Sequence, residues 1–502
     1  MEDIERLKED ARAGRIDSAR LIDLIVALQR RLQAADKRIE ELEKQLKQLG
    51  GAGTAKVAEP FSMRAEEQRQ EARGRKKKRR RKDKKRRGRL SSADKVKQAE
   101  RTEPVFPEGV APDDCQRSHV RPVWRLENGR AVLVAYQVYR GPKNQYGKIP
   151  GVLGRSEFGM EIILEIAHLV YVIGLSFDKV CQLLQFFQNL HLGKSQVDSL
   201  LHRLARHWEK EFDALCTLLA NSLVVHTDET GWSLNSVWAM LSEKARILLS
   251  GVHKDADTLK LLLDPATFAG LVVSDDAAVY AGFTQAQKCW AHLLRKAIKL
   301  TLQDPDEPTY RAFADRLLEI YREACRVQGD GRLSDAGRAA KVAALDDDIL
   351  EMCADMWVQE LPPQDGPLDD YRLLVNELMR LMLAQQLFTF VLARPVEQLS
   401  GETTPVSGTN NEAERTLRGA AEARKTGRTN KTANGARRRT ILASVLESLR
   451  LHLPTFTLPS VIAEVMRWSE VGCSCFTALM KQLKLQLPRQ SLLEQLFPTP
   501  SG

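Results

Sequence analysis

The chain has 502 residues, a formal net charge of +10 and a hydrophobic content of 43%. A chain of this length holds more than one domain and can bury large cores. It shows no secretory signal, and its longest apolar stretch, residues 162–175, is interrupted by Glu165 and His168, which excludes a membrane span. Its eight cysteines have no disulfide-like spacing. We therefore expect a cytoplasmic protein, associated with the nucleoid if it binds DNA.

The excess positive charge is concentrated in one segment. Residues 73–89 hold 14 Lys or Arg against a single acid, Asp83, which gives a local charge of +13. Because the whole chain carries +10, the rest of it sums to −3. Like charges at this density cannot pack, so we expect a disordered arm that contacts a nucleic-acid backbone. A solubilising tail or a nuclear localisation signal is the alternative.

Residues 18–49 carry a heptad repeat. The a positions are Ile25, Leu32, Ile39 and Leu46, and the d positions are Leu21, Leu28, Ala35, Leu42 and Leu49. This narrow seam predicts a coiled coil within residues 1–50 that pairs two or more copies of the chain, with a helix packed inside one chain as the alternative. A linker and the basic arm fill residues 51–100. A basic-zipper factor has its basic helix directly before the zipper, so this order argues against that class.

Residues 101–217 are expected to form a helical domain of the DNA-binding type. Region 101–150 is ambiguous, with short candidate strands such as 131–139, and the pattern becomes helical from 155. Two helices joined by a turn form a candidate helix-turn-helix over 176–210, which either reads a DNA groove or is only structural. The second helix would turn Val197, Leu200, Leu201 and Leu204 inward and Gln196, Ser199, Arg203 and Arg206 outward.

From residue 218 the pattern changes to strands. Apolar runs at 223–227, 237–241 and 245–252 are followed by a helix near 256–263, a buried strand at 271–274 and a short strand near 288–290. With a helix between the last two strands, this is the β-β-β-α-β-α-β order of an α/β ribonuclease H-like core. In that core the first and fourth strands are neighbours. Asp228 and Asp275 would then emerge side by side.

The remainder of the chain is expected to be mostly α. Residues 218–300 form the first part of the core, and residues 301–405 form an all-α insertion because they are helical in pattern and rich in Leu, Ala and Arg. Residues 406–453 return to the core with a helix and a basic segment. Residues 454–502 form a helical tail. The predicted fold class is therefore multidomain and mostly α, with an interrupted ribonuclease H-like core.

Three acidic residues lie in distinctive settings. Asp228 and Asp275 each close an apolar run, and Glu414 lies near the start of a helical stretch. Carboxylates at the ends of buried strands and at the start of a helix can converge on a pair of hard cations. Such a site is suited to in-line attack on a phosphodiester. The basic arm indicates that the phosphodiester belongs to DNA.

These settings, the Cys289-Trp-Ala-His292-Leu-Leu-Arg295 run and the Asn410-Asn411-Glu-Ala-Glu414-Arg415 run resemble the transposases of insertion-sequence-66 elements over roughly residues 150–450. The resemblance implies a DDE transposase that cuts the terminal inverted repeats of its element and joins them to target DNA, with accessory proteins of the element as further partners. It implies that Asp228, Asp275 and Glu414 hold two Mg²⁺ ions, for which Mn²⁺ can substitute. It also places His292 beside the active site.

Each acid has a neighbour that competes for its role. Residues adjacent on a strand point to opposite faces, so only one of Asp228 and Glu229 can enter the site. The family spacing favours Asp275 over Asp276, and Glu414 over Glu412. A single Cys-x-x-His pair is not a structural zinc site. The family often carries a four-cysteine ribbon after the basic arm, but this chain has only Cys115 there, which argues against zinc.

Basic residues in the arm, in the candidate helix-turn-helix and along and after the Glu414 helix are predicted to contact DNA phosphates. They are Arg75, Lys76, Lys77, Lys78, Arg79, Arg80, Arg81, Lys82, Lys84, Lys85, Arg86, Arg87, Arg203, Arg415, Arg418, Arg424, Lys425, Arg428, Arg437, Arg438 and Arg439. Two other functions remain open at this point. One is a catalytically silent DNA-binding relative, and the other is a metal-dependent nuclease without strand transfer.

Overall fold

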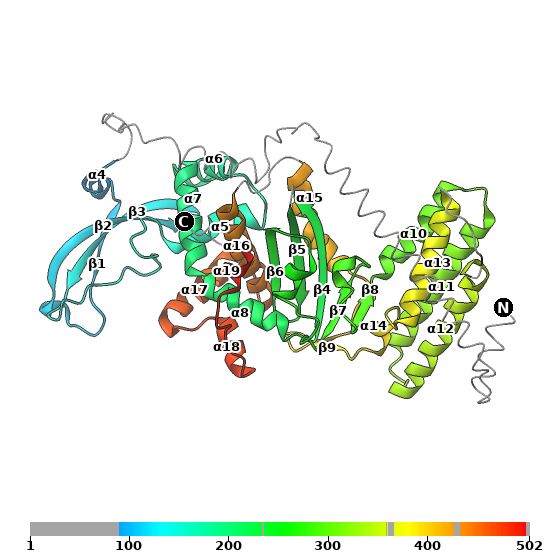
Figure 1. Cartoon of the computed structure of the whole chain (residues 1–502). Helices are drawn as coiled ribbons and strands as arrows, with labels where there is room; N and C mark the ends of the chain where they lie inside the picture. Colours follow the sequence, from blue (N-terminus) through cyan, green and yellow to red (C-terminus); the bar gives the residue numbers. More distant parts are fainter. Residues whose placement is uncertain (1–89, 233–234, 358, 360–365, 426–431, 498–502) are drawn as a thin grey trace.

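The computed structural model describes residues 90–232, 235–357, 359, 366–425 and 432–497. The predicted coiled coil and basic arm lie outside the described residues. The described part is a mixed α/β structure that is mostly helical, as predicted. Its parts follow one another in a row: a small sheet, a helical cluster, a larger sheet and a helical bundle (Figure 1). Within the described part, no helix is long and apolar enough to cross a membrane.

The first part is a three-stranded sheet of order β1-β3-β2, preceded by a short helix. Its elements are α4 (Ser92–Lys97), β1 (Arg101–Val105), the 3-10 helix η1 (Pro112–Asp114), β2 (Gln116–Glu127) and β3 (Arg130–Arg140). The expected helical character of residues 101–217 is therefore wrong for residues 101–140, whereas the candidate strand at 131–139 is confirmed as β3. Asn128 and Gly129, with φ of 49° and 76°, join β2 to β3, and an Asn-Gly pair of this conformation is a strong hairpin signal.

Four helices follow and pack with the C-terminal helices. They are α5 (Met160–Tyr171), α6 (Phe177–Gln188), α7 (Lys194–His207) and α8 (Glu209–Ala220), covered by α17 (Leu458–Val471), α18 (Cys475–Gln482) and α19 (Leu492–Leu496). The α6–α7 pair confirms the two predicted helices. Val197, Leu200, Leu201 and Leu204 are all buried. Gln196, Ser199 and Arg206 are exposed, and Arg203 is half-buried. Groove reading by α7 stays a prediction.

The central sheet has five strands in the order β6-β5-β4-β7-β8. The strands are β4 (Val224–Trp232), β5 (Asn235–Ser242), β6 (Arg246–Val252), β7 (Leu271–Ser274) and β8 (Ala286–Lys288). β4, β5 and β6 are antiparallel, whereas β7 and β8 run parallel to β4. The predicted contact between the first and fourth strands is confirmed. A helix, α9 (Ala256–Lys260), precedes β7, but only the 3-10 helix η2 (Ala278–Tyr280) lies between β7 and β8.

Two helices after the insertion return to this sheet. α15 (Asn411–Lys425) packs on β4 and β5, and α16 (Ala433–His452) lies along the outer strand β6 (Figure 1). Thr440, Ser444 and Ser448 are fully buried on α16. Their hydroxyls accept hydrogen bonds from the N–H groups of Ser250, Leu248 and Arg246 at 3.0, 2.9 and 2.9 Å. Four helical residues rise about 6 Å, close to the span of two strand residues. The helix therefore satisfies the open edge of the sheet.

Removing one of these hydroxyls should lower the stability of the protein, because one N–H group at the sheet edge then lacks an acceptor. We expect Ser444→Ala to lower the free energy of unfolding by about 1–3 kcal/mol, because the buried N–H of Leu248 loses its acceptor. Urea unfolding of the full chain measures the change. Ser199→Ala on the exposed face of α7 is the control for the helix propensity of Ser and Ala. An unchanged Ser444→Ala protein would show that the edge does not depend on this bond.

The helical bundle lies between β8 and α15 in the chain. It consists of α10 (Trp290–Gln303), α11 (Pro308–Gly329), α12 (Asp335–Trp357), α13 (Pro367–Leu383) and α14 (Thr389–Leu392), with the two-residue strands β9 (Val396–Glu397) and β10 (Thr403–Thr404) after it. The bundle has a hydrophobic core of its own, which also receives Val224, Leu271 and Val273 of the sheet. The described residues of 301–405 are mostly helical apart from this short hairpin, and their assignment as an insertion stays a prediction.

Candidate active site

Asp228 and Asp275 lie on neighbouring parallel strands or directly after them. The register of β4 and β7 pairs His226 with Val273, and two residues further along each chain come Asp228 and Asp275. Both residues are half-buried. Asp275 Oδ1 accepts a hydrogen bond of 3.0 Å from the backbone N–H of Ala277, which fixes the turn after β7. The structure thus brings the first two predicted acids together.

The carboxyl group of Asp228 is in a strongly unfavourable environment for a negative charge. Burial raises the pKa of Asp228 to about 7, and the charges of Glu229, Asp275 and Glu414 act in the same direction. A backbone hydrogen bond from Glu229 acts in the opposite direction. Such a group of carboxylates is stabilised by a bound divalent cation, for which oxygen donors of this kind are suitable ligands.

Glu229 lies on the opposite face of β4 from Asp228 and is already paired. Its side chain is 1% exposed and forms an ion pair with Lys254 Nζ at 2.5 Å. The hydroxyl of Tyr280 donates a hydrogen bond to it. Because its charge is satisfied inside the protein, this arrangement favours Asp228 as the acid that faces the site.

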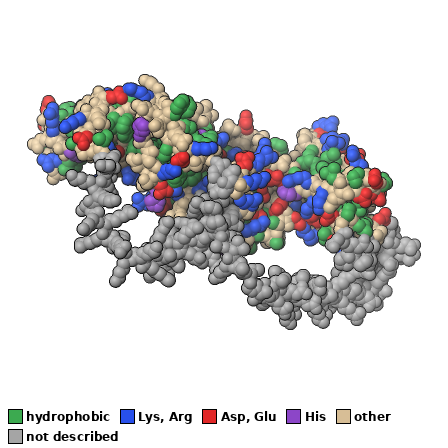
Figure 2. Space-filling view, turned by 90° about the horizontal axis from the view of Figure 1, so that it is seen from above, with side chains coloured by type: hydrophobic (Ala, Val, Ile, Leu, Met, Phe, Trp, Pro, Cys, Tyr) green, Lys and Arg blue, Asp and Glu red, His purple; other side chains and the backbone are tan. Residues whose placement is uncertain are grey.

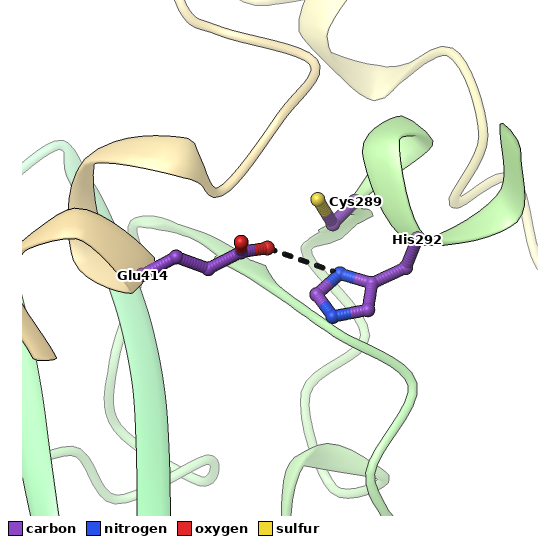
Figure 3. A group of neighbouring side chains, drawn as sticks. All are labelled: Cys289, His292 and Glu414. Atoms are coloured by element: carbon purple, nitrogen blue, oxygen red, sulfur yellow. Dashed lines mark ion pairs between the residues drawn. The ribbon is translucent and has the colours of Figure 1, made fainter. Parts of the chain in front are cut away.

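The first turn of α15 separates its two glutamates in the same way. Residues two apart on a helix point in nearly opposite directions. Glu412 pairs with Arg246 of β6 at 2.6 Å. Glu414 turns toward α10, where Arg295 holds its carboxylate at 2.6 Å and His292 Nδ1 lies 3.5 Å away (Figure 3). Of these two glutamates, Glu414 is the one whose charge raises the pKa of Asp228.

Asn410 anchors the start of α15 against both other elements of the site. It is fully buried, and its Nδ2 donates to the carbonyl oxygen of Thr227 at 2.7 Å. Its backbone N–H donates to Cys289 Sγ at 3.1 Å. This residue thus ties α15 to β4 beside Asp228 and to the start of α10. Its role was not recognised from the sequence, although the Asn-Asn pair was the signal for it.

Within the described residues, one group of three His, Cys or acidic ligand atoms lies within 4.8 Å, formed by Cys289, His292 and Glu414 (Figure 3). Asp228 and Asp275 do not join Glu414 in such a group in this conformation. The group is a poor fit for zinc, because burial raises the pKa of the Cys289 thiol and zinc requires a thiolate. Its Sγ also accepts the Asn410 N–H, and Arg295 already neutralises Glu414.

The predicted DNA-binding residues fall into two groups in the structure. Arg415, Arg418, Arg424 and Lys425 are exposed on α15, and the Arg424 guanidinium donates to the carbonyl oxygen of Gly231 at 2.9 Å. These side chains lie on the helix that carries Glu414, and their contact with DNA stays a prediction. Arg428 and the basic arm lie outside the described residues.

The three consecutive arginines of α16 face other helices instead. Arg437 pairs with Glu209 at 3.1 Å, and Arg438 pairs with Asp198 at 2.6 Å and donates to the Tyr171 hydroxyl at 2.8 Å. Arg439 is half-buried. These contacts join α16 to α5, α7 and α8. The structure therefore does not bring Arg437 and Arg438 to the acidic site as free phosphate ligands.

Positive and negative side chains are interspersed over the face seen from above (Figure 2). This agrees with a chain that carries −3 outside its basic arm. No broad single-sign surface is visible there among the described residues. Long-range attraction to DNA would therefore depend on the arm more than on this face.

Comparison with known protein families identifies the class of this protein. It is a transposase, an enzyme that transfers DNA. The model of the family described as Transposase IS66 family matches residues 155–438. This stretch is more than half of the chain and includes Asp228, Asp275 and Glu414. The chain therefore belongs to the IS66 transposase family. A search of the curated proteins returns no match.

Proposed function

We propose that this protein cuts the ends of a bacterial insertion sequence and joins them to target DNA, with Asp228, Asp275 and Glu414 as the metal-binding acids. The observation that carries the proposal is the environment of Asp228. Burial first, and then the charges of Glu229, Asp275 and Glu414, raise its pKa to about 7. A divalent cation bound between Asp228, Asp275 and Glu414 would relieve this accumulation of negative charge.

The strand order supports the same function. Three antiparallel strands followed by two parallel ones, in the order β6-β5-β4-β7-β8, match the order expected of a ribonuclease H-like core. α15 then supplies the third acid from the covering helix. An insertion between β8 and α15 explains why Glu414 is far from Asp275 in the sequence.

Two Mg²⁺ ions bound at this site would activate the attacking oxygen and stabilise the leaving oxygen. The protein's own part is to hold three carboxylates on rigid elements. Glu414 would exchange its ion pair with Arg295 for metal ligation, and Arg295 would then be available to a phosphate. Burial lowers the pKa of His292. Its Nδ1 lies 3.5 Å from the Glu414 carboxylate and 3.5 Å from the Arg295 guanidinium, so this ring borders the third acid.

The exposed cations of α15 would hold the DNA backbone beside these acids. Pairing of two copies through residues 1–50, accessory proteins of the element and a nucleoid location belong to the same proposal. The proposed domains are the predicted ones, with the β1-β3-β2 sheet as a separate unit at the start of residues 101–217.

Cleavage and joining of element-end DNA with the full-length protein test this function. We expect 3′-hydroxyl ends and joined products with Mg²⁺ or Mn²⁺, and binding without cutting with Ca²⁺, since the chemistry requires two closely positioned ions of strict geometry. Binding without cutting in every metal would indicate a silent relative. Cutting without joining would indicate a nuclease. Near-stoichiometric zinc in the purified protein would overturn the assignment of the metal.

A further inference from the structure

We infer that the helical insertion positions the second metal-binding acid, through Arg380 of α13 and the buried Lys288 of β8, which together hold the Asp275–Asp276 turn. This inference rests on the proposed function of Asp275. It assigns positioning roles to two residues that do not themselves reach the metal site. It also makes the bundle, which lies outside the catalytic sheet, part of the architecture of the site.

Lys288 is a buried cation beneath this turn. Its residue is 3% exposed, and its Nζ donates to the carbonyl oxygen of Asp275 at 3.1 Å and contacts Ser274 Oγ at 3.4 Å. Asp276 Oδ1 lies 3.9 Å away, and the ring centroid of Tyr280 lies 5.8 Å away. A buried ammonium is retained only where such partners compensate it. Here the partners are the backbone and side chains of the turn that carries Asp275.

Arg380 holds the same turn from the other side. Its guanidinium donates to the Asp276 carboxylate. The connection after α13 adds a further link, since the backbone N–H of Lys288 donates to the carbonyl oxygen of Gln386 at 2.9 Å. The insertion thus contacts both the turn and the buried cation beneath it.

These contacts separate the roles of two adjacent carboxylates. Asp276 is drawn toward Arg380 and Lys288, while Asp275 is left beside Asp228 with its Oδ1 on the Ala277 N–H. Without this compensation, the Asp276 charge would be free to repel or replace Asp275. Partners of metal ligands of this kind commonly change metal affinity or activity by about 10- to 100-fold when removed.

The test uses full-length protein and three variants. Arg380→Gln removes the side chain that holds Asp276, Arg380→Lys keeps its charge, and Lys296→Gln is the matched control. Lys296 of α10 forms an ion pair with Glu377 of α13 at 2.5 Å and does not pair with Asp276. Arg380 is 54% exposed, so its loss should not unfold the bundle. Lys288→Met provides a second, independent variant of similar length.

We expect Arg380→Gln to raise the Mn²⁺ concentration for half-saturation about tenfold, measured by electron paramagnetic resonance on the DNA-free protein. Hydrogen exchange at the Ala277 amide should accelerate in parallel. Lys288→Met should act in the same direction, Arg380→Lys should restore part of the affinity, and Lys296→Gln should match the parent.

Two results would separate the inference from the function on which it rests. If Asp275→Asn abolishes cleavage but both Arg380→Gln and Lys288→Met bind Mn²⁺ and exchange like the parent, the positioning role is wrong and the proposed function stands. If Asp275→Asn cleaves and binds Mn²⁺ normally, the proposed function itself fails. An equal loss of affinity in Lys296→Gln would assign the effect to the interface as a whole and overturn the role of Arg380.

Discussion

Asp228→Asn, Asp275→Asn and Glu414→Gln should each reduce cleavage of element-end DNA by about 1,000-fold or more. Each change removes the charge of a proposed metal ligand but keeps the size of the side chain, so several kcal/mol of transition-state stabilisation should be lost while the fold remains. DNA binding should stay near the parental level, because phosphate contacts come from other residues. Gel-based cleavage and binding measurements on the same preparations separate the two effects.

Glu412→Gln is the matched control on the same helix turn. Its carboxylate pairs with Arg246 rather than facing Asp228, so its loss should leave cleavage within a few-fold of the parent. Normal cleavage by Glu414→Gln together with loss in Glu412→Gln would show that the third acid has been assigned to the wrong residue.

The Asp228 variant should also become more stable without metal. The folded-state pKa of Asp228 is raised from 3.8 to about 7, so the folded protein binds this proton more tightly than the unfolded chain does. Ionising the group therefore destabilises the fold as pH rises from about 4 to about 7. Metal-free Asp228→Asn should consequently melt above the parent at pH 8, with a difference that shrinks toward pH 4.

Local patterns predicted most of the central sheet, but the last strand ends at Lys288 and only a 3-10 helix precedes it. The apolar runs at 223–227, 237–241, 245–252 and 271–274 all lie in strands or reach into them, because buried strands require such runs. Of the N-terminal sheet, only the strand at 131–139 was predicted. Its β2 strand carries several arginines, and its parallel pairing of β1 with β3 joins segments distant in sequence. Only the candidate strand at 131–139, which is β3, and the Asn128-Gly129 turn indicated it locally.

The candidate site shows the same division between local and long-range information. The positions of Asp228 and Asp275 follow from the order of the strands, and both could be selected from their local setting. The residues that pair with one of two adjacent acids, and so distinguish the two, could not be predicted from the local sequence. Arg295 lies 119 residues from Glu414, and Arg380 lies 104 residues from Asp276. Such pairs arise from packing of the insertion against the sheet, which no local periodicity encodes.

Neutralising the basic arm should produce the largest change in DNA affinity. Each phosphate contact contributes a slope of roughly −0.9 to the log–log dependence of binding on salt. Replacing the 14 Lys and Arg of residues 73–89 with Gln or Ser should therefore weaken binding to all sequences by several orders of magnitude at low salt and flatten its salt dependence. The rest of the chain sums to −3, so little other long-range attraction remains.

A deletion of residues 1–50 is the companion variant, because it removes the predicted coiled coil and keeps the arm. It should lower the oligomeric state in sedimentation while leaving contact with a single DNA end largely intact. If the neutralised protein binds random duplex DNA as tightly at low salt as the parent, the arm only solubilises the chain. Recognition would then have to come from α7 and from the exposed cations of α15, since Arg437 and Arg438 are already paired with Glu209 and Asp198.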